Sequence, residues 1–267
     1  MSKQIIHIGA NKTGSTTLQR YLFSQSKDLA TIGEDCRDYS YGTSDEIRKL
    51  SDSIILDDDI YYQREEVERL FSTHIEQNKN KTIVYSDEDI SMSRLHTICA
   101  QRIYSLMPDS HILLVIRDQV TALSSWYTNH GAYLRNVPYR YWRQPVELDE
   151  WMEHCFRFPR YSPLDGFKYF QLIELYENLF GKEKITILYY EDFLNTPDLF
   201  MKQLSNLLEI EEDECKRHLV GRWSRKTSRV IILSDHWTKL IQEFYKDENK
   251  KLADKYFNGI NRYEGIQ

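Results

Sequence analysis

The chain has 267 residues, 41% of them hydrophobic, which suits one large α/β domain or two small ones and allows a sizeable core. Its net charge of −6 excludes a bulk attraction to nucleic acid or to an anionic membrane, so an anionic ligand needs a local basic site. The four cysteines lie far apart without C-x-x-C spacing, which argues against a zinc site or a disulfide framework. No leader peptide or membrane-spanning run is visible, so we expect a cytoplasmic protein without a membrane span.

A strand, a glycine loop and a helix are predicted at the start of the chain. Ile5–Ile8 is typical of a buried strand, and Gly9 ends it. From Ser15 the hydrophobic period becomes helical. In such an arrangement the backbone N–H groups of the loop and the helix N-terminus face one anion. The side chains that add donors are those of Lys12, Ser15, Thr16 and Thr17.

The position of lysine in this loop differs from that in the nucleoside-triphosphatase loop, in which lysine directly follows the second glycine. Here Lys12 precedes Gly14 by two residues. The stretch Lys12-Thr13-Gly14-Ser15-Thr16 resembles the 5′-phosphosulfate loop of sulfotransferases, K-[ST]-G-[ST]-T. The alternative is a glycine turn capped by hydroxyl residues, which is common before helices.

Three carboxylates follow the second predicted strand. Residues 28 to 62 are polar, and we expect an irregular surface excursion there, followed by a helix at about 63 to 78. Thr82–Ser86 is typical of a buried strand and ends in Asp87-Glu88-Asp89. Because ligands bind beyond the carboxyl ends of parallel strands, this cluster is expected near the phosphate loop. Another helix is predicted at about 92 to 107.

The third strand, His111–Ile116, ends at Arg117, and a helix beginning near Val120 carries Ser125. An arginine fork and a serine hydroxyl can converge on one phosphate. Sulfotransferases bind the 3′-phosphate of their donor with R-x-P-x-x-x-x-x-S-x-Y, which this stretch resembles, although Gln119 replaces the usual proline. Taken alone, the motif also fits a surface Arg–Asp pair and a helix serine.

The segment from 133 to 163 is irregular and is interrupted by prolines. Its aromatic residues are Tyr133, Tyr139, Tyr141, Trp142, Trp151 and Tyr161. Flat aromatic faces with polar neighbours suit a sugar or an aromatic acceptor, whereas the alternative is a lid whose aromatics pack on the core. Acidic residues interrupt any basic stripe for nucleic acid here.

The remaining chain predicts a helix ending near Gly181, a strand at Ile185–Tyr190 and a helix with Pro197 at its first position. Residues 221 to 229 form a basic, loop-like stretch before a last helix that begins near Ser234. Sulfotransferases often return to the nucleotide with a late basic loop, which makes Arg225 and Lys226 candidates. A solvated turn is the alternative.

The chain thus resembles 3′-phosphoadenosine 5′-phosphosulfate (PAPS)-dependent sulfotransferases through landmarks that follow one another in the expected order. The resemblance implies one domain over 1–267, a three-layer α/β/α fold with a central, mainly parallel sheet, and sulfuryl transfer to an acceptor hydroxyl or amine, leaving adenosine 3′,5′-bisphosphate. A carbohydrate acceptor is favoured by the aromatic segment, and the sequence shows no metal-ligand set.

The resemblance also implies roles for single residues. Lys12 would stabilise charge on the leaving oxygen, and Glu88 would be the base, with Asp87, Asp89 and His130 as rivals. Arg117 and Ser125 would hold the 3′-phosphate. A helix cap is the alternative role for Glu88. The competing functions are a nucleotide-dependent kinase with magnesium at Asp87, and a nucleotide-binding protein without catalysis.

Overall fold

The computed structural model describes residues 2–33, 45–128, 146–222 and 231–263, and the chain divides into two compact units. The first unit is built from Met1–Ile116 and Leu175–Ser224, and the second from Arg117–Glu174 and Arg225–Gln267. The organisation of the whole chain as one domain stays a prediction. Within the described residues, no helix combines the length and apolar character of a membrane span.

The first unit contains a five-stranded, fully parallel sheet in the order β2-β3-β1-β4-β5. The strands are β1 (Gln4–Gly9), β2 (Leu29–Gly33), β3 (Thr82–Asp87), β4 (His111–Ile116) and β5 (Ile185–Tyr189). The helices in and between them are α1 (Ser15–Thr17), η1 (Leu18–Phe23), α2 (Asp45–Leu56), α3 (Arg64–Gln77), η2 (Asp89–Met92), α4 (His96–Leu106), η6 (Lys182–Lys184), α9 (Tyr190–Asn195), α10 (Pro197–Leu208) and α11 (Glu212–Leu219). The predicted α/β fold with a parallel central sheet is confirmed.

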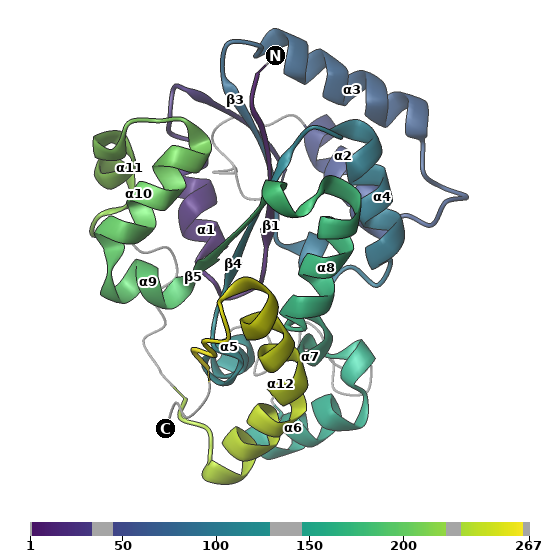
Figure 1. Cartoon of the computed structure of the whole chain (residues 1–267). Helices are drawn as coiled ribbons and strands as arrows, with labels where there is room; N and C mark the ends of the chain where they lie inside the picture. Colours follow the sequence, from purple (N-terminus) through teal and green to yellow (C-terminus); the bar gives the residue numbers. More distant parts are fainter. Residues whose placement is uncertain (1, 34–44, 129–145, 223–230, 264–267) are drawn as a thin grey trace. The chain divides into compact units, whose positions relative to one another are not determined.

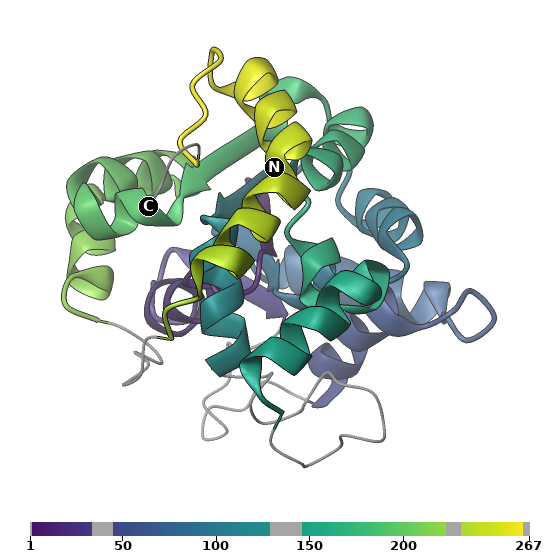
Figure 2. The same cartoon turned by 90° about the horizontal axis from the view of Figure 1, so that it is seen from below.

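Helices cover both faces of this sheet. Figure 1 shows α1, α10 and α11 on one side and α2, α3 and α4 on the other, and Figure 2 shows the same division from below. Because side chains alternate along a strand, Val84 faces the cluster that includes Leu18 and Leu22, whereas Tyr85 packs edge-on against Phe71 of α3. The predicted helical face of Leu18, Leu22 and Phe23 is buried.

The segment from 28 to 62 differs from the expected irregular excursion, since it contains the edge strand β2 and the helix α2. The end of α2 is held by Arg102 of α4, whose side chain is only 5% exposed. Its guanidinium donates to the carbonyls of Ser53, Ile54 and Asp57 at 3.2, 3.2 and 2.7 Å. A cation at a helix C-terminus satisfies carbonyls that lack partners within the helix. This support comes from a distant part of the chain, so the local pattern did not indicate it.

The second unit is helical in its described residues. Its helices are α5 (Gln119–Trp126), α6 (Leu148–Arg157), η5 (Pro159–Tyr161), α7 (Pro163–Gly166) and α12 (Asp235–Tyr256). The helix α8 (Tyr169–Phe180) begins in the second unit and ends in the first. Tyr245 of α12 is fully buried and donates to the carbonyl of Leu164 at 2.7 Å, which ties α12 to α7.

Candidate functional site

The phosphate loop between β1 and α1 contains two left-handed residues. Lys12 has φ 68° and Gly14 has φ 87°, and Gly14 precedes the first residue of α1. Left-handed residues between right-handed ones bring successive N–H groups toward one point, which is the geometry of an anion-binding concavity. The helix begins within the loop, because Thr17 N–H donates to the Gly14 carbonyl at 2.8 Å.

The hydroxyl side chains of the loop have different roles. Thr13 Oγ1 donates to the Ala10 carbonyl at 2.5 Å, and Ser15 Oγ donates to the same carbonyl at 3.3 Å. Thr13 and Ser15 are buried, so their hydroxyls hold the loop in its shape. Thr16 instead reaches out of the loop and donates to Glu88 Oε1 at 3.0 Å. Thr16 therefore joins the loop to the turn after β3.

Side chains alternate between the two faces of β3, and this alternation determines which carboxylate lies next to the phosphate loop. Ser86 faces the α1 side, where its hydroxyl accepts from Gln19 Nε2 at 3.1 Å. Asp87 faces the opposite side and accepts a hydrogen bond from Ser51 of α2. Glu88 returns to the α1 side and contacts Thr16. Glu88 and Asp87 thus point to opposite faces, as neighbouring residues of an extended segment do.

The rivals of Glu88 are placed differently. Asp87 is 2% exposed, its Oδ1 accepts the Asp89 N–H at 2.9 Å, and burial raises its pKa to about 7. Asp89 is exposed. Glu88 occupies the position before η2 but its side chain makes no capping hydrogen bond there. His130 lies outside the described residues.

Close contacts at the two glycines of the loop, one of them with Tyr190, shape the loop. A Cβ at Gly9 would lie 2.9 Å from Ser15 Oγ and 3.1 Å from Glu88 Cγ, so only glycine permits this approach. A Cβ at Gly14 would lie 3.2 Å from Cε2 of Tyr190. The first residue of α9 therefore packs against the phosphate loop.

In the second unit, Arg117 and Ser125 lie along one edge of α5. Arg117 Nε donates to Thr121 Oγ1 at 3.1 Å, and Thr121 precedes Ser125 by one helical turn. Asp118 caps the helix by accepting the Thr121 N–H at 2.9 Å. The sequence reasoning did not single out Thr121, although its i, i+4 relation to Ser125 was the available signal.

Two residues of α5, Gln119 and Ser124, form hydrogen bonds with later parts of the chain. Gln119, which replaces the usual proline, exchanges two hydrogen bonds with Asn249 of α12, at 2.8 and 3.2 Å. Ser124, adjacent to Ser125, donates to the carbonyl of Ile231. Arg225 and Lys226 lie outside the described residues, but the chain that follows them is thus bound to α5.

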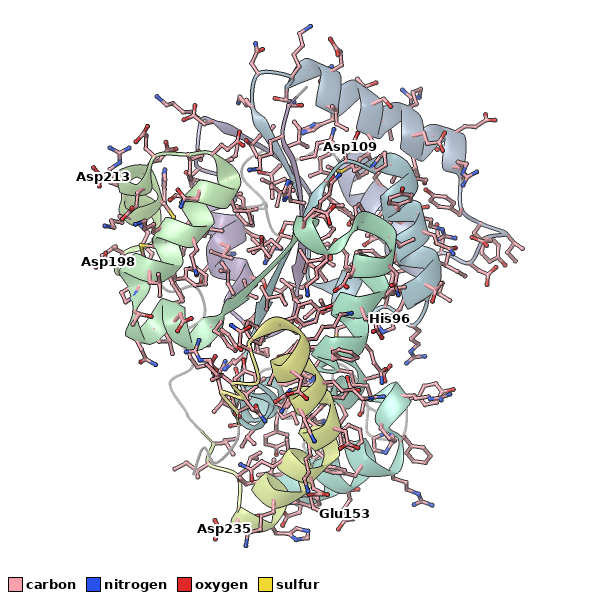
Figure 3. The ribbon with its side chains drawn as sticks, in the orientation of Figure 1. His96, Asp109, Glu153, Asp198, Asp213 and Asp235 are labelled. Carbon is pink, nitrogen blue, oxygen red and sulfur yellow. The ribbon has the colours of Figure 1, made fainter. Side chains whose placement is uncertain are left out.

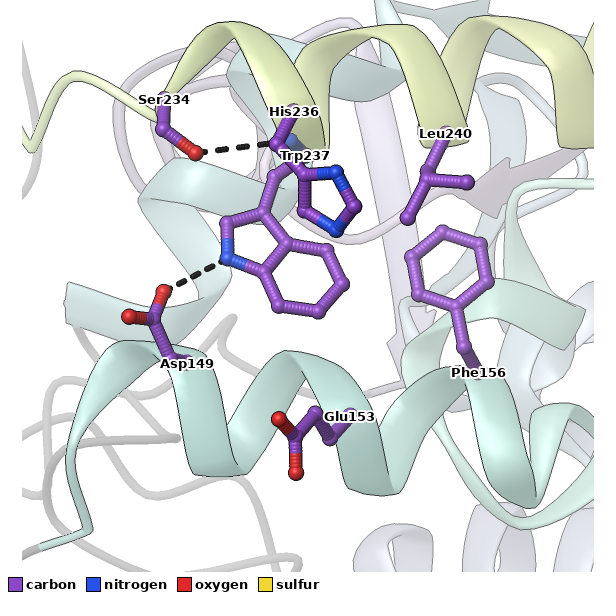
Figure 4. A pocket seen from close by; sticks show the side chains of 7 residues that line it. All are labelled: Asp149, Glu153, Phe156, Ser234, His236, Trp237 and Leu240. Atoms are coloured by element: carbon purple, nitrogen blue, oxygen red, sulfur yellow. Dashed lines mark hydrogen bonds between the residues drawn. The ribbon is translucent and has the colours of Figure 1, made fainter.

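A pocket of about 590 Å³ lies between α6 and α12 (Figure 4). Its lining residues are Asp149, Glu153, Phe156, Ser234, His236, Trp237 and Leu240. Trp237 donates its indole N–H to Asp149 at 2.6 Å and stacks on Phe156, with ring centroids 5.9 Å apart. Of the aromatic residues predicted for the segment from 133 to 163, Trp151 is buried, Tyr161 is 64% exposed, and the other four lie outside the described residues. Glu153 and Asp235 are exposed near this pocket (Figure 3).

Titratable side chains elsewhere do not form a metal centre. Among the described residues, no group of three or more His, Cys, Asp or Glu side chains is arranged to hold a metal ion. The buried His7, beside Ser86 at 2.8 Å, has its pKa lowered to about 3 by burial, so it stays neutral. Cys99, Cys155 and Cys215 are buried free thiols.

This chain has the fold of several solved sulfotransferases. It resembles a sulfotransferase from Alicyclobacillus acidocaldarius, with a TM-score of 0.63 and 16% identity over 95% of both chains. A Mycobacterium avium sulfotransferase gives a TM-score of 0.55 and 12% identity over 96% of this chain and 77% of that one. A mouse sulfotransferase complexed with PAP gives 0.53 and 10%, over 97% of this chain and 86% of that one. Because the sequence identities are this low, the structural similarity establishes the fold alone.

Sequence comparisons give the family. A search of curated proteins finds no sequence match to this chain. The model of the sulfotransferase family matches residues 4–214, which include the phosphate loop, Glu88, Arg117 and Ser125. The match spans most of the 267 residues. The chain therefore belongs to the sulfotransferase family.

Proposed function

We propose that this sulfotransferase takes a sulfuryl group from PAPS and transfers it to a hydroxyl or amine of an acceptor, with Glu88 as the base. The observation that carries the proposal is the hydrogen bond of 3.0 Å from Thr16 to Glu88. It holds a carboxylate beside a loop built for an anion. An acid–base group and a phosphate site side by side are what a transfer to a hydroxyl requires.

The phosphate loop would hold the 5′-phosphosulfate. Its left-handed backbone at Lys12 and Gly14 supports an anion site, and the start of α1 adds the favourable end of the helix dipole. As the acceptor oxygen bonds to sulfur and the bond from sulfur to the bridging oxygen breaks, negative charge develops on the leaving phosphate. Lys12 would stabilise that charge. Glu88 would take the proton that the acceptor loses.

The second unit would hold the far end of the nucleotide. Arg117 Nε donates to Thr121 Oγ1 at 3.1 Å, which links the guanidinium to α5, and a guanidinium is a planar fork of donors that suits a phosphate. Ser125 follows Thr121 along the same helix edge. Arg225 and Lys226, which the resemblance to sulfotransferases makes candidates, would add positive charge at the same phosphate. A 3′-phosphate bound by Arg117 and Ser125 would distinguish a 3′-phosphorylated nucleotide from one without that group.

We further propose a carbohydrate acceptor, with an amine as the second choice. The pocket lined by Asp149 and Glu153 supports this proposal, since carboxylates accept hydrogen bonds from sugar hydroxyls or from an ammonium group. Their charge would disfavour an anionic acceptor. The proposal assigns no role to a metal ion.

A nucleotide-dependent kinase is the competing function, and one comparison separates the two. Asp87, the candidate magnesium ligand, is buried and both its carboxylate oxygens accept hydrogen bonds from the protein, which weighs against that role. Adenosine 3′,5′-bisphosphate should raise the melting temperature, because a ligand at about 100 times its Kd stabilises by about 2.7 kcal/mol. Stabilisation by ATP with magnesium, and not by the bisphosphate, would contradict the proposal.

A further inference from the structure

We propose that Ser91 is a positioning residue that fixes Glu88 relative to the phosphate loop, an inference that rests on the proposed role of Glu88 as the base. Ser91 lies in η2 and is fully buried. Its hydroxyl oxygen lies 2.8 Å from the carbonyl oxygen of Gly9 and 3.0 Å from that of Glu88. One buried hydroxyl thus bridges the last residue of β1 and the residue that carries the base.

The sheet does not hold Glu88 by itself. The parallel register of β1 and β3 ends with the pair Ile8 and Asp87, so Glu88 is the first residue beyond the ladder. Gly9 is likewise the last residue of β1, where the phosphate loop begins. Ser91 supplies the next link between the two chain segments after the ladder ends. A further link between the turn and the loop is the side-chain hydrogen bond from Thr16 to Glu88.

Close packing at this point makes the backbone position matter. A Cβ on Gly9 would lie only 3.2 Å from Glu88 Cα, so the two backbones are already near contact. On the other side, Asp87 accepts the Asp89 N–H at 2.9 Å and holds the turn toward α2. Loss of the Ser91 hydroxyl would remove the hydrogen bond toward Gly9 and would keep the one between Asp87 and Asp89. A general base displaced by a fraction of an ångström to about 1 Å loses about tenfold to hundredfold in rate.

The chain offers a matched control in Ser93. Ser93 is also buried, and its hydroxyl also makes two backbone hydrogen bonds, donating to the Ile55 carbonyl at 3.0 Å and accepting from Leu95 N–H at 3.1 Å. These bonds tie the turn to α2 and to the start of α4 rather than to Gly9 and Glu88. Ser91→Ala and Ser93→Ala therefore remove similar groups, and both variants should melt at similarly lowered temperatures.

The test measures PAPS-dependent turnover at saturating donor, and the Kd of adenosine 3′,5′-bisphosphate by calorimetry, in the full chain. Ser91→Ala should lower kcat by about tenfold or more while the Kd stays within about twofold, and Ser93→Ala should keep kcat near the wild-type value. A kcat for Ser91→Ala no lower than that for Ser93→Ala would overturn the proposal.

A double mutant shows whether Ser91 acts through Glu88. If it does, Ser91→Ala should cost little further turnover in a Glu88→Gln background, because coupled residues are not additive. The same fold loss in both backgrounds would refute a positioning role and leave the proposed base in place. Normal turnover of Glu88→Gln itself would remove the proposed base and this inference together, whereas a failure confined to Ser91 leaves the proposed function standing.

Discussion

A single methyl group at Gly9 tests how closely the phosphate loop must approach the turn that carries Glu88. In Gly9→Ala the new Cβ would lie 2.9 Å from Ser15 Oγ and 3.2 Å from Glu88 Cα. The serine hydroxyl can rotate, at the expense of its bond to Ala10, but the contact with Glu88 Cα is relieved only when the backbone moves. The loop and the turn must therefore separate by a few tenths of an ångström.

This separation should be visible in both stability and rate. Overpacking of a buried site costs about 1–3 kcal/mol, which in a protein of this size lowers the melting temperature by about 2–5 °C. The shift of the base should lower turnover by about tenfold. Calorimetric melting and sulfate transfer from PAPS, measured on the same preparation, give the two values.

Gly259→Ala is the control for the general cost of replacing glycine. Gly259 has φ 79°, and its added Cβ would meet no atom closer than 3.9 Å. Its cost is backbone strain of about 1–2 kcal/mol, without an effect on turnover. A Gly9→Ala protein that melts and turns over like the wild type would refute the close-approach reasoning.

Three further variants test other parts of the molecule. Arg117→Ala should weaken the binding of adenosine 3′,5′-bisphosphate by about 1.5–3 kcal/mol and leave the binding of adenosine 5′-monophosphate nearly unchanged in calorimetry. An equal loss of affinity for both ligands would contradict the assignment of Arg117 to the 3′-phosphate. Burial raises the pKa of Asp87 from 3.8 to about 7, so the folded state holds its proton more tightly and the contribution of Asp87 to stability is lost as pH rises through this range. Urea unfolding at several pH values should show this decline in the wild type and a flatter profile in Asp87→Asn; parallel profiles would contradict the assignment. Arg102→Ala should lower the free energy of unfolding in urea by about 3 kcal/mol, because three carbonyls lose a charged donor. The control Lys79→Ala removes an exposed ion pair and should lower it by less than about 0.5 kcal/mol. Similar losses in the two variants would show that Arg102 does not support α2.

The elements that position the site follow from local patterns and could be predicted. Buried stretches rich in branched apolar residues mark β1, β3 and β4, and each is followed by residues that the sequence predicted for the site. The orientation of Glu88 follows from the period of two along β3, which sends Asp87 to α2 and Glu88 to Thr16. Neither inference needs a contact between distant residues.

What could not be predicted depends on such distant contacts. The helix α2 is capped by Arg102, which is 45 to 49 residues later in the chain. Gln119 replaces a proline because its amide pairs with Asn249, 130 residues away. Ser91 and Tyr190 stand in unremarkable positions of the sequence, and only the folded chain places them against Gly9 and Gly14. Pattern and propensity describe neighbours along the chain, whereas these partners are set by the sheet order.

The central claim is that Glu88 takes the acceptor proton beside the phosphate loop. Glu88→Gln preserves the size of the side chain and an oxygen that can accept from Thr16, so the fold and the affinity for adenosine 3′,5′-bisphosphate should be retained. Asp89→Asn, at the exposed neighbouring carboxylate, is the matched control and should keep normal turnover.

The most direct measurement is transfer of labelled sulfate from PAPS to an accepted carbohydrate or amine by these two variants. We expect Glu88→Gln to lose about 10²–10⁴-fold in turnover while its melting temperature and bisphosphate Kd match the wild type. Near-normal turnover in a well-folded Glu88→Gln protein would contradict the claim.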